Sequence, residues 1–238
     1  RMARRLKNDE ELESSDIVAN CRMNREREIT GTNSYAADLG FDLLDFLTER
    51  LENQSSVAWL DLCCGSARAL IQAAQHFHAA GLGERVRIDG VDLVGMFQPR
   101  AGHLTELHLH TASITTWEPG RNYDLITCVH GLHYIGDKLT LIARAASWLN
   151  DSGRFIGHLD LANITFDDGK SSPNRLGRQF SDWGFRYDSR RHLLSRTGGG
   201  NVHFPYAFLG SDDTAGPNFT GQPAVDSHYT TESPRGRH

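Results

Sequence analysis

Apolar runs of strand length alternate, in the middle of this chain, with segments whose apolar residues recur at helical spacing. The runs predict five strands: Val57–Leu62, Val86–Leu93, Leu107–Thr111, Tyr123–Val129 and Arg154–Leu161. The spacing predicts helices near 67–80, 99–104 and 139–149, and an amphipathic helix over 41–51. Alternating strands and helices build a parallel sheet that binds ligands at the carboxyl ends of its strands.

The last third of the chain is less regular. Pro173–Trp183 predicts a helix, and Gly184–Thr197 and Val202–Leu209 predict two strands joined by the glycine-rich stretch 198–201. We therefore expect an α/β fold with a doubly wound, mostly parallel seven-stranded sheet, a C-terminal antiparallel strand pair and helices on both faces. From residue 211 on, Gly, Pro, Thr and Asp predict a loop or tail.

The segment 57–75 has the pattern of a ligand-binding turn. An apolar strand reaches Asp61, small residues follow through Ala67, and a strong helix former begins after them. Such a turn brings backbone N–H groups and a helix N-terminus to a ligand. The next strand ends at Asp92, where a carboxylate can accept hydrogen bonds from two ribose hydroxyls. Together the two segments predict a cofactor that contains a nucleoside.

The glycine pattern of this turn chooses among such cofactors. A dinucleotide site needs G-x-G-x-x-G, because the backbone must approach a pyrophosphate. Here Cys63 and Ala67 stand at the first and third glycine positions and only Gly65 remains, which disfavours a pyrophosphate. The stretch Asp61-Leu62-Cys63-Cys64-Gly65-Ser66-Ala67 resembles motif I of the class I S-adenosylmethionine-dependent methyltransferases, often D-x-G-C-G-x-G, whose ligand carries no phosphate.

The resemblance covers residues 35–161 by motifs and the rest by topology. It implies a single methyltransferase domain over 1–238, with an N-terminal lid and helix in 1–50, a cofactor-binding core in 51–161, and C-terminal strands and substrate loops in 162–238.

The resemblance also implies where S-adenosylmethionine binds. Asp61 would lie at its amino-acid end and Asp92 at its ribose. The segment after the third strand lacks the acid often found there, so Ser113 or the backbone on either side would hold the adenine edge. The expected cofactor contacts are Tyr35, Asp61, Cys63, Gly65, Asp92, Leu93, Ser113, Ile114 and, by its backbone, His130. Asp61 could instead cap the turn or helix that follows it.

Composition narrows the class of partner. The 238 residues carry a net charge of -5, which gives no sign of a nucleic-acid partner. No apolar run reaches membrane-spanning length, and the charged N-terminus lacks an apolar secretory core. The cysteines at 21, 63, 64 and 128 form no C-x-x-C pair, so we expect reduced thiols, no metal and a cytoplasmic protein.

Methyl transfer needs a base only when the acceptor holds a proton, and His130 or His133 could serve as that base or could be core or surface histidines. Two segments could form the acceptor pocket, one around Arg25, Arg27 and Asn33 and one around Tyr206, with Tyr134 lining it. Several arginines would suit an anionic acceptor such as a carboxylate.

We expect O-methylation of a small molecule or peptide, with His130 and His133 as catalytic residues and Arg25, Asn33, Tyr134 and Tyr206 as substrate contacts. The alternatives are an NAD(P)-dependent oxidoreductase and a catalytically silent S-adenosylmethionine-binding protein. The sequence leaves the oligomeric state open.

Overall fold

The computed structural model describes residues 5–20, 26–167 and 171–231. Its helices are α1 (Asp9–Glu13), α2 (Asp16–Asn20), α3 (Tyr35–Leu39), α4 (Leu43–Asn53), α5 (Arg68–Ala79), α6 (Lys138–Ser147) and α7 (Pro173–Asp182), with short 3-10 turns η2 (Gly83–Arg85), η3 (Gly131–Tyr134) and η4 (Leu161–Asn163). Its strands are β1 (Val57–Leu62), β2 (Val86–Asp92), β3 (Leu107–Thr111), β4 (Tyr123–Cys128), β5 (Leu149–His158), β6 (Ile164–Thr165), β7 (Phe185–Asp188), β8 (Leu193–Thr197), β9 (Tyr206–Asp212) and β10 (Asp226–Thr231).

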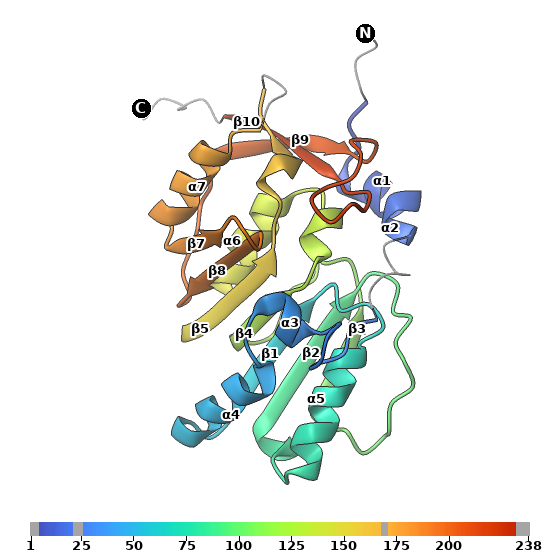
Figure 1. The fold of residues 1–238 in the computed structure, drawn as a ribbon, viewed down its shortest axis with the longest axis vertical. Coiled ribbons are helices and arrows are strands. Elements are labelled where there is room, and N and C mark those ends of the chain that lie inside the picture. Colours follow the sequence, from blue (N-terminus) through green and yellow to red (C-terminus); the bar gives the residue numbers. More distant parts are fainter. Residues whose placement is uncertain (1–4, 21–25, 168–170, 232–238) are drawn as a thin grey trace.

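Seven of the described strands form one sheet in the order β3-β2-β1-β4-β5-β8-β7 (Figure 1). The pairs from β3 through β5 are parallel, and β8 runs antiparallel to both β5 and β7. The order reverses between β1 and β4, which places a ligand-binding crevice at the carboxyl ends of these two strands. The expected fold class is confirmed.

The central strand β1 is buried along its whole length, which is why it appears in the sequence as a continuous apolar run. Side chains alternate between the faces of a sheet. Ala58, Leu60 and Leu62 pack into a core with α6 and α7, whereas Val57 and Trp59 pack into a second core with α4 and α5. Helices therefore cover both faces.

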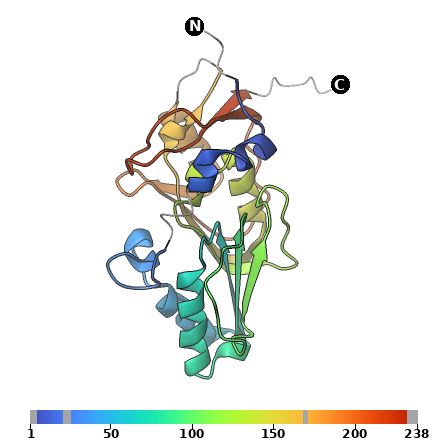
Figure 2. The same cartoon turned by 90° about the vertical axis from the view of Figure 1, so that its right-hand side faces the viewer.

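A second, three-stranded sheet of order β6-β10-β9 lies beyond the carboxyl ends of the main strands. Helices α1 and α2 lie beside it in both ribbon views (Figures 1 and 2). Lys7, just before α1, exchanges two backbone hydrogen bonds of 2.8 Å with Ser211 of β9. The N-terminal segment is thereby fixed over the strand ends by this second sheet.

Three local expectations were wrong. The antiparallel pair is β7 with β8, joined through residues 189–192, whereas β9 belongs to the second sheet. The region after residue 211 contains β10 rather than only loop. No helix forms at 99–104; the chain there is held by the Gln98 N–H, which donates to the carbonyl of Ser66 at 2.9 Å.

Candidate cofactor and acceptor site

The turn between β1 and α5 alternates into left-handed backbone. Cys63, Gly65 and Ala67 have φ angles of 61°, 59° and 62°. This conformation costs a residue with a Cβ about 1–2 kcal/mol, and glycine escapes that cost. These are the three positions at which motif I of the family carries glycine. The chain therefore keeps the turn's backbone path while Cys63 and Ala67 bear its strain.

Asp92 ties this turn to the end of β2. Its Oδ2 accepts the N–H of Gly65 at 2.9 Å, and its Oδ1 accepts the N–H of Val94 at 3.2 Å. Asp92 is only 8% exposed. Asp92 thereby joins the turn to the end of β2.

Asp61 is fully buried and lies under the turn. The hydroxyl of Tyr35, the first residue of α3, donates to Asp61 Oδ2 at 2.7 Å, and the hydroxyl of Thr127 in β4 donates to its other oxygen. Trp59 Nε1 donates to the same Thr127 hydroxyl at 2.8 Å. Asp61 does not cap α5, whose N-cap is Ala67. The structure thus brings together Tyr35 and Asp61, two of the residues expected to contact the cofactor.

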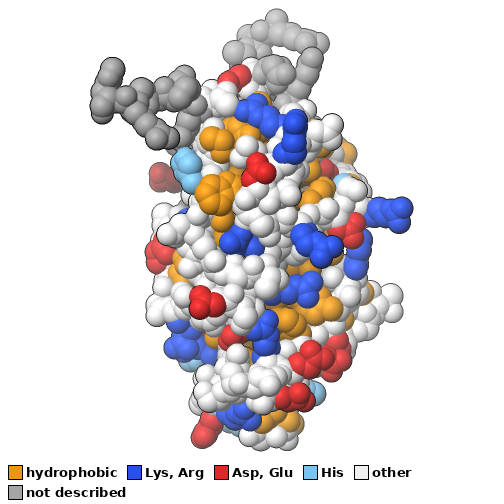
Figure 3. All heavy atoms as spheres, turned by 90° about the vertical axis from the view of Figure 1, so that its left-hand side faces the viewer, with side chains coloured by type: hydrophobic (Ala, Val, Ile, Leu, Met, Phe, Trp, Pro, Cys, Tyr) orange, Lys and Arg blue, Asp and Glu red, His pale blue; other side chains and the backbone are white. Residues whose placement is uncertain are grey.

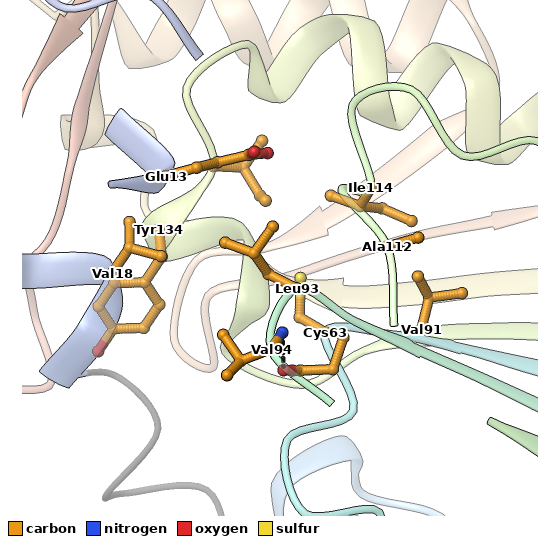
Figure 4. A pocket seen from close by; sticks show the side chains of 11 residues that line it. Glu13, Val18, Cys63, Val91, Leu93, Val94, Ala112, Ile114 and Tyr134 are labelled. Atoms are coloured by element: carbon orange, nitrogen blue, oxygen red, sulfur yellow. Dashed lines mark hydrogen bonds between the residues drawn. The ribbon is translucent and has the colours of Figure 1, made fainter. Parts of the chain in front are cut away.

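A small cavity of about 50 Å³ opens beside the turn. Figure 4 shows side chains from the ends of β1, β2 and β3 turned toward it, with Glu13 and Val18 from α1 and α2 on the opposite side. It is lined by Glu13, Val18, Cys63, Val91, Asp92, Leu93, Val94, Ala112, Ile114, Tyr134 and Ile135. Five of the sequence-predicted residues meet here: Cys63, Asp92, Leu93, Ile114 and Tyr134.

The sequence reasoning missed Glu13 and Val18 as lining residues. A signal for α1 itself exists, since Asn8 and Glu11 form a capping box at its start. No local pattern indicates where a capped five-residue helix will pack.

Four histidines gather next to this turn. His130 Nδ1 lies 3.2 Å from Nε2 of His133, and the His130 ring stacks on His158 of β5 with centroids 3.9 Å apart. Phe219 stacks on His192 at 3.8 Å and meets the edge of His133 at 5.5 Å. Sequence reasoning named only His130 and His133; the chain's abundance of histidine near strand ends was the available signal for the other two.

The loop 130–134, called the histidine loop below, packs directly against the turn 63–67, called the cofactor turn. A Cβ added at Gly131 would lie 2.7 Å from Cβ of Cys63 and 2.8 Å from Sγ of Cys128, so only glycine fits without a shift. His130, immediately before it, adopts a left-handed φ of 58°. The geometry brings the histidines next to the turn that follows β1.

Asp38 of α3 faces the outer side of this cluster. Its Oδ2 lies 3.6 Å from Nε2 of His130 and also accepts a hydrogen bond from Arg27. Burial raises the pKa of Asp38, but the contacts with His130 and Arg27 outweigh burial and lower it overall. Burial, aided by repulsion from His130, lowers the pKa of His158 to about 3, so His158 is neutral at ordinary pH.

The structure does not bring every expected residue to the cavity. The exposed Asn33 donates from Nδ2 to the carbonyl of Glu26 at 3.4 Å. The Tyr206 hydroxyl accepts a hydrogen bond of 3.0 Å from Arg175 Nε, away from the cavity. Ser113 adjoins the cavity between two of its lining residues, and Arg25 lies outside the described residues.

Within the described ranges, no group of three or more His, Cys, Asp or Glu side chains is arranged to hold a metal ion. None of the described helices combines the length and apolar character that crossing a bilayer requires.

Figure 3 shows the face that carries α7, where basic and acidic side chains are interspersed.

Comparisons with known proteins identify the family of this chain. A family model described as a methyltransferase domain matches residues 32–198. A search of curated proteins finds no significant match.

Among solved structures, the chain resembles magnesium protoporphyrin IX methyltransferase from Synechocystis PCC 6803 with bound SAM, at 17% identity and a TM-score of 0.47, over 80% of this chain and 95% of that one. It also resembles the [4+2]-cyclase SpnF at 14% identity and a TM-score of 0.49, over 77% of this chain and 75% of that one. The third is coclaurine N-methyltransferase bound to N-methylheliamine and SAH, at 22% identity and a TM-score of 0.39; the match covers 56% of this chain and only 38% of that protein. Likenesses of this degree do not bear on the substrate.

The family match spans well over half of the chain and includes the turn, Asp92 and the histidine loop. It excludes the alternative of a dinucleotide oxidoreductase, which the glycine pattern had already disfavoured. The chain belongs to the class I methyltransferase-domain family and is an S-adenosylmethionine-dependent methyltransferase.

Proposed function

We propose that this methyltransferase methylates a hydroxyl oxygen of a small-molecule or peptide acceptor, with His133 taking the hydroxyl proton and His130 orienting His133. The observation that supports this most is the series Asp38, His130 and His133, joined by contacts of 3.6 Å and 3.2 Å and packed on the cofactor turn through Gly131.

The cavity residues fit the nucleoside part of the cofactor. Val91, Leu93 and Ile114 form apolar walls that suit a purine, and the Asp92 carboxylate at the rim suits ribose hydroxyls. Tyr35 and Asp61 would act on the methionine end and, by their hydrogen bond under the turn, would hold its backbone in shape. When bound, S-adenosylmethionine supplies an activated methyl group, so the protein supplies position and the exclusion of water.

The contacts between the histidines favour one tautomer. If His130 directs Nε2–H toward Asp38, its Nδ1 accepts the Nε2–H of His133. The lone pair of His133 then lies on Nδ1, the nitrogen that can take a proton. The Asp38 carboxylate, kept ionised by its lowered pKa, stabilises the positive charge that follows.

A hydroxyl acceptor suits these contacts better than the carboxylate that the arginine-rich N-terminal segment suggested. A carboxylate needs no base, and Arg27, one candidate anion contact, is paired with Asp38. The aromatic ring of Phe219 and the Tyr134 side chain at the cavity would offer apolar surface to an organic acceptor.

The test is to identify the product. The purified protein is incubated with isotope-labelled S-adenosylmethionine and the small-molecule fraction of a cell extract, and labelled species are characterised by mass spectrometry before and after alkali. A methyl ether survives alkali, whereas a methyl ester is cleaved. The same assay is run with His133→Asn, His130→Asn and, as a control, the exposed His103→Asn.

We expect an alkali-stable O-methyl product, a rate loss of about 10²–10⁴-fold in His133→Asn, and a normal rate in His103→Asn. The wild-type kcat/KM should decline toward acid pH, and this acid limb should vanish in the His133 variant. An alkali-labile ester formed equally well by both histidine variants, or an N-methyl product, would refute the proposal.

A further inference from the structure

Glu13 is an acid from outside the main sheet that reaches the cofactor cavity. It is the last residue of α1, and it lines the cavity together with Ala112 and Ile114, which follow β3. Figure 4 shows its carboxylate extending from α1 over the cavity toward the side where Ile114 lies. The carboxylate therefore reaches the residues at the end of β3.

One oxygen of this carboxylate is fixed by the chain. The hydroxyl of Ser113, between the two β3-end lining residues, donates to Oε1 of Glu13. The same hydroxyl accepts the N–H of Thr115 at 3.2 Å, which fixes its direction. Among the described residues, Oε2 of Glu13 has no hydrogen-bond donor, so this oxygen can accept one from a ligand.

Helix α1 is held in place independently of Ser113. Lys7 and Ser211 exchange two backbone hydrogen bonds, and Lys7 Nζ forms an ion pair with Asp213 at 2.5 Å. The capping box of Asn8 and Glu11 closes the first turn of the helix. Glu13 is thus positioned by the second sheet before any ligand arrives.

We propose that Glu13 is a specificity residue for the cofactor: its Oε2 accepts a hydrogen bond from the exocyclic amino group of adenine. The turn after β3, where the sequence lacks an acid, places Ser113 instead, and Ser113 holds Glu13 at the same place. A carboxylate accepts from an exocyclic amine and repels a ring carbonyl, so the site selects a 6-aminopurine over a 6-oxopurine. This inference concerns the cofactor and does not depend on the acceptor proposed above.

The experiment measures the binding of two cofactor products by isothermal titration calorimetry. S-adenosylhomocysteine carries the 6-amino group, and S-inosylhomocysteine carries a 6-oxo group and is otherwise the same. The proteins are the wild type, Glu13→Gln and the matched control Glu10→Gln, which removes the same charge from an exposed position of the same helix. Glu13→Leu is a second variant that has no polar group, and thermal unfolding checks that each variant folds.

We expect the wild type and Glu10→Gln to prefer the adenine compound by about 10-fold to 100-fold, the effect of one hydrogen bond to a charged group. In Glu13→Gln the preference should shrink by about 10-fold or more, because the amide can donate to the 6-oxo group, and in Glu13→Leu it should disappear. An unchanged ratio, or an equal loss of affinity for both compounds, would mean that Glu13 only fastens α1 and would overturn the inference. Since no acceptor enters this assay, failure of the proposed O-methylation would leave its result unaffected.

Discussion

The cofactor region and the histidine region meet at the strand ends, but the chain builds them in different ways. The cofactor region comes mainly from residues 57–114, where each side chain lies at the end of its strand or a few positions after it. The histidine region joins Asp38 on α3, His130 and His133 after β4, His158 on β5, His192 before β8, and Phe219 before β10. Chemistry shared by a family can be encoded in one local segment, whereas the histidine region depends on tertiary assembly.

The two regions also use charge differently. In the cofactor region, the acids Asp61 and Asp92 accept hydrogen bonds from hydroxyl or backbone donors. In the histidine region, the stacked ring of His130 faces Asp38, and burial keeps His158 neutral. The histidine region should therefore be the one that acid disturbs first.

The largest expected effect comes from His158. As pH falls below its usual pKa of 6.5, the unfolded chain binds a proton on this residue, while the folded chain does not until about pH 3. Stability should therefore fall with pH between 6.5 and 3, by at most about 5 kcal/mol at roughly 1.4 kcal/mol per pH unit. Chemical denaturation across this range measures the slope.

The matched variant is His158→Phe, which keeps a ring against His130 and removes the titrating group. Its stability should depend less steeply on pH than that of the wild type, and the exposed His76→Gln should behave as the wild type. Equal slopes in all three proteins would show that His158 does not set the acid sensitivity of this region.

The next effect tests the cofactor region alone. Asp92→Ala removes the acceptor for the Gly65 and Val94 N–H groups. It also removes the proposed contact with the ribose. Binding of S-adenosylhomocysteine should weaken by about 1.5–3 kcal/mol by calorimetry. The exposed Asp45→Ala is the charge control. Affinity equal to that of the wild type would remove Asp92 from the site.

The smallest effect probes the contact between the two regions. Gly131→Ala places a methyl group against Cys63 and Cys128, an overpacking that should cost about 1–3 kcal/mol in the free energy of unfolding. Both cofactor affinity and the methylation rate should fall, because the turn and the histidine loop move together. The control is Gly102→Ala, where an added Cβ meets nothing within 4 Å. Loss of the rate with unchanged cofactor affinity would show that the regions are mechanically separate.

The fold was predictable because its central strands can be recognised in the sequence. Expected bounds for β1 and β3 match the structure: β1 is buried along its whole length, and β3, at the edge of the sheet, alternates Leu with His. The misplaced hairpin shows the limit. Its turn uses Asp188, whose Oδ1 accepts the N–H groups of Arg190 and Arg191, rather than the glycines at 198–200. Those glycines allow close backbone contact instead: Gly198 donates to the carbonyl of Gly153 at 2.7 Å.

The site was predictable to the same extent. The positions of Asp92 and of the 63–67 turn follow from strand order and turn length, and the structure brings them together. Glu13 and His192 could not be found in this way, because each reaches the site through the packing of an element with no motif of its own. The absence of an acid after β3 did indicate that another group would have to hold the adenine edge.

Cys63 carries a practical consequence. Its thiol lines the cavity and is partly exposed, whereas Cys64 and Cys128 are buried. In a variant with Cys21 replaced by serine, a small alkylating reagent should label this one sulfur, and a nucleoside bound in the cavity should shield it. The rate of labelling then reports site occupancy directly, and cofactor analogues can be ranked before any methyl acceptor is identified.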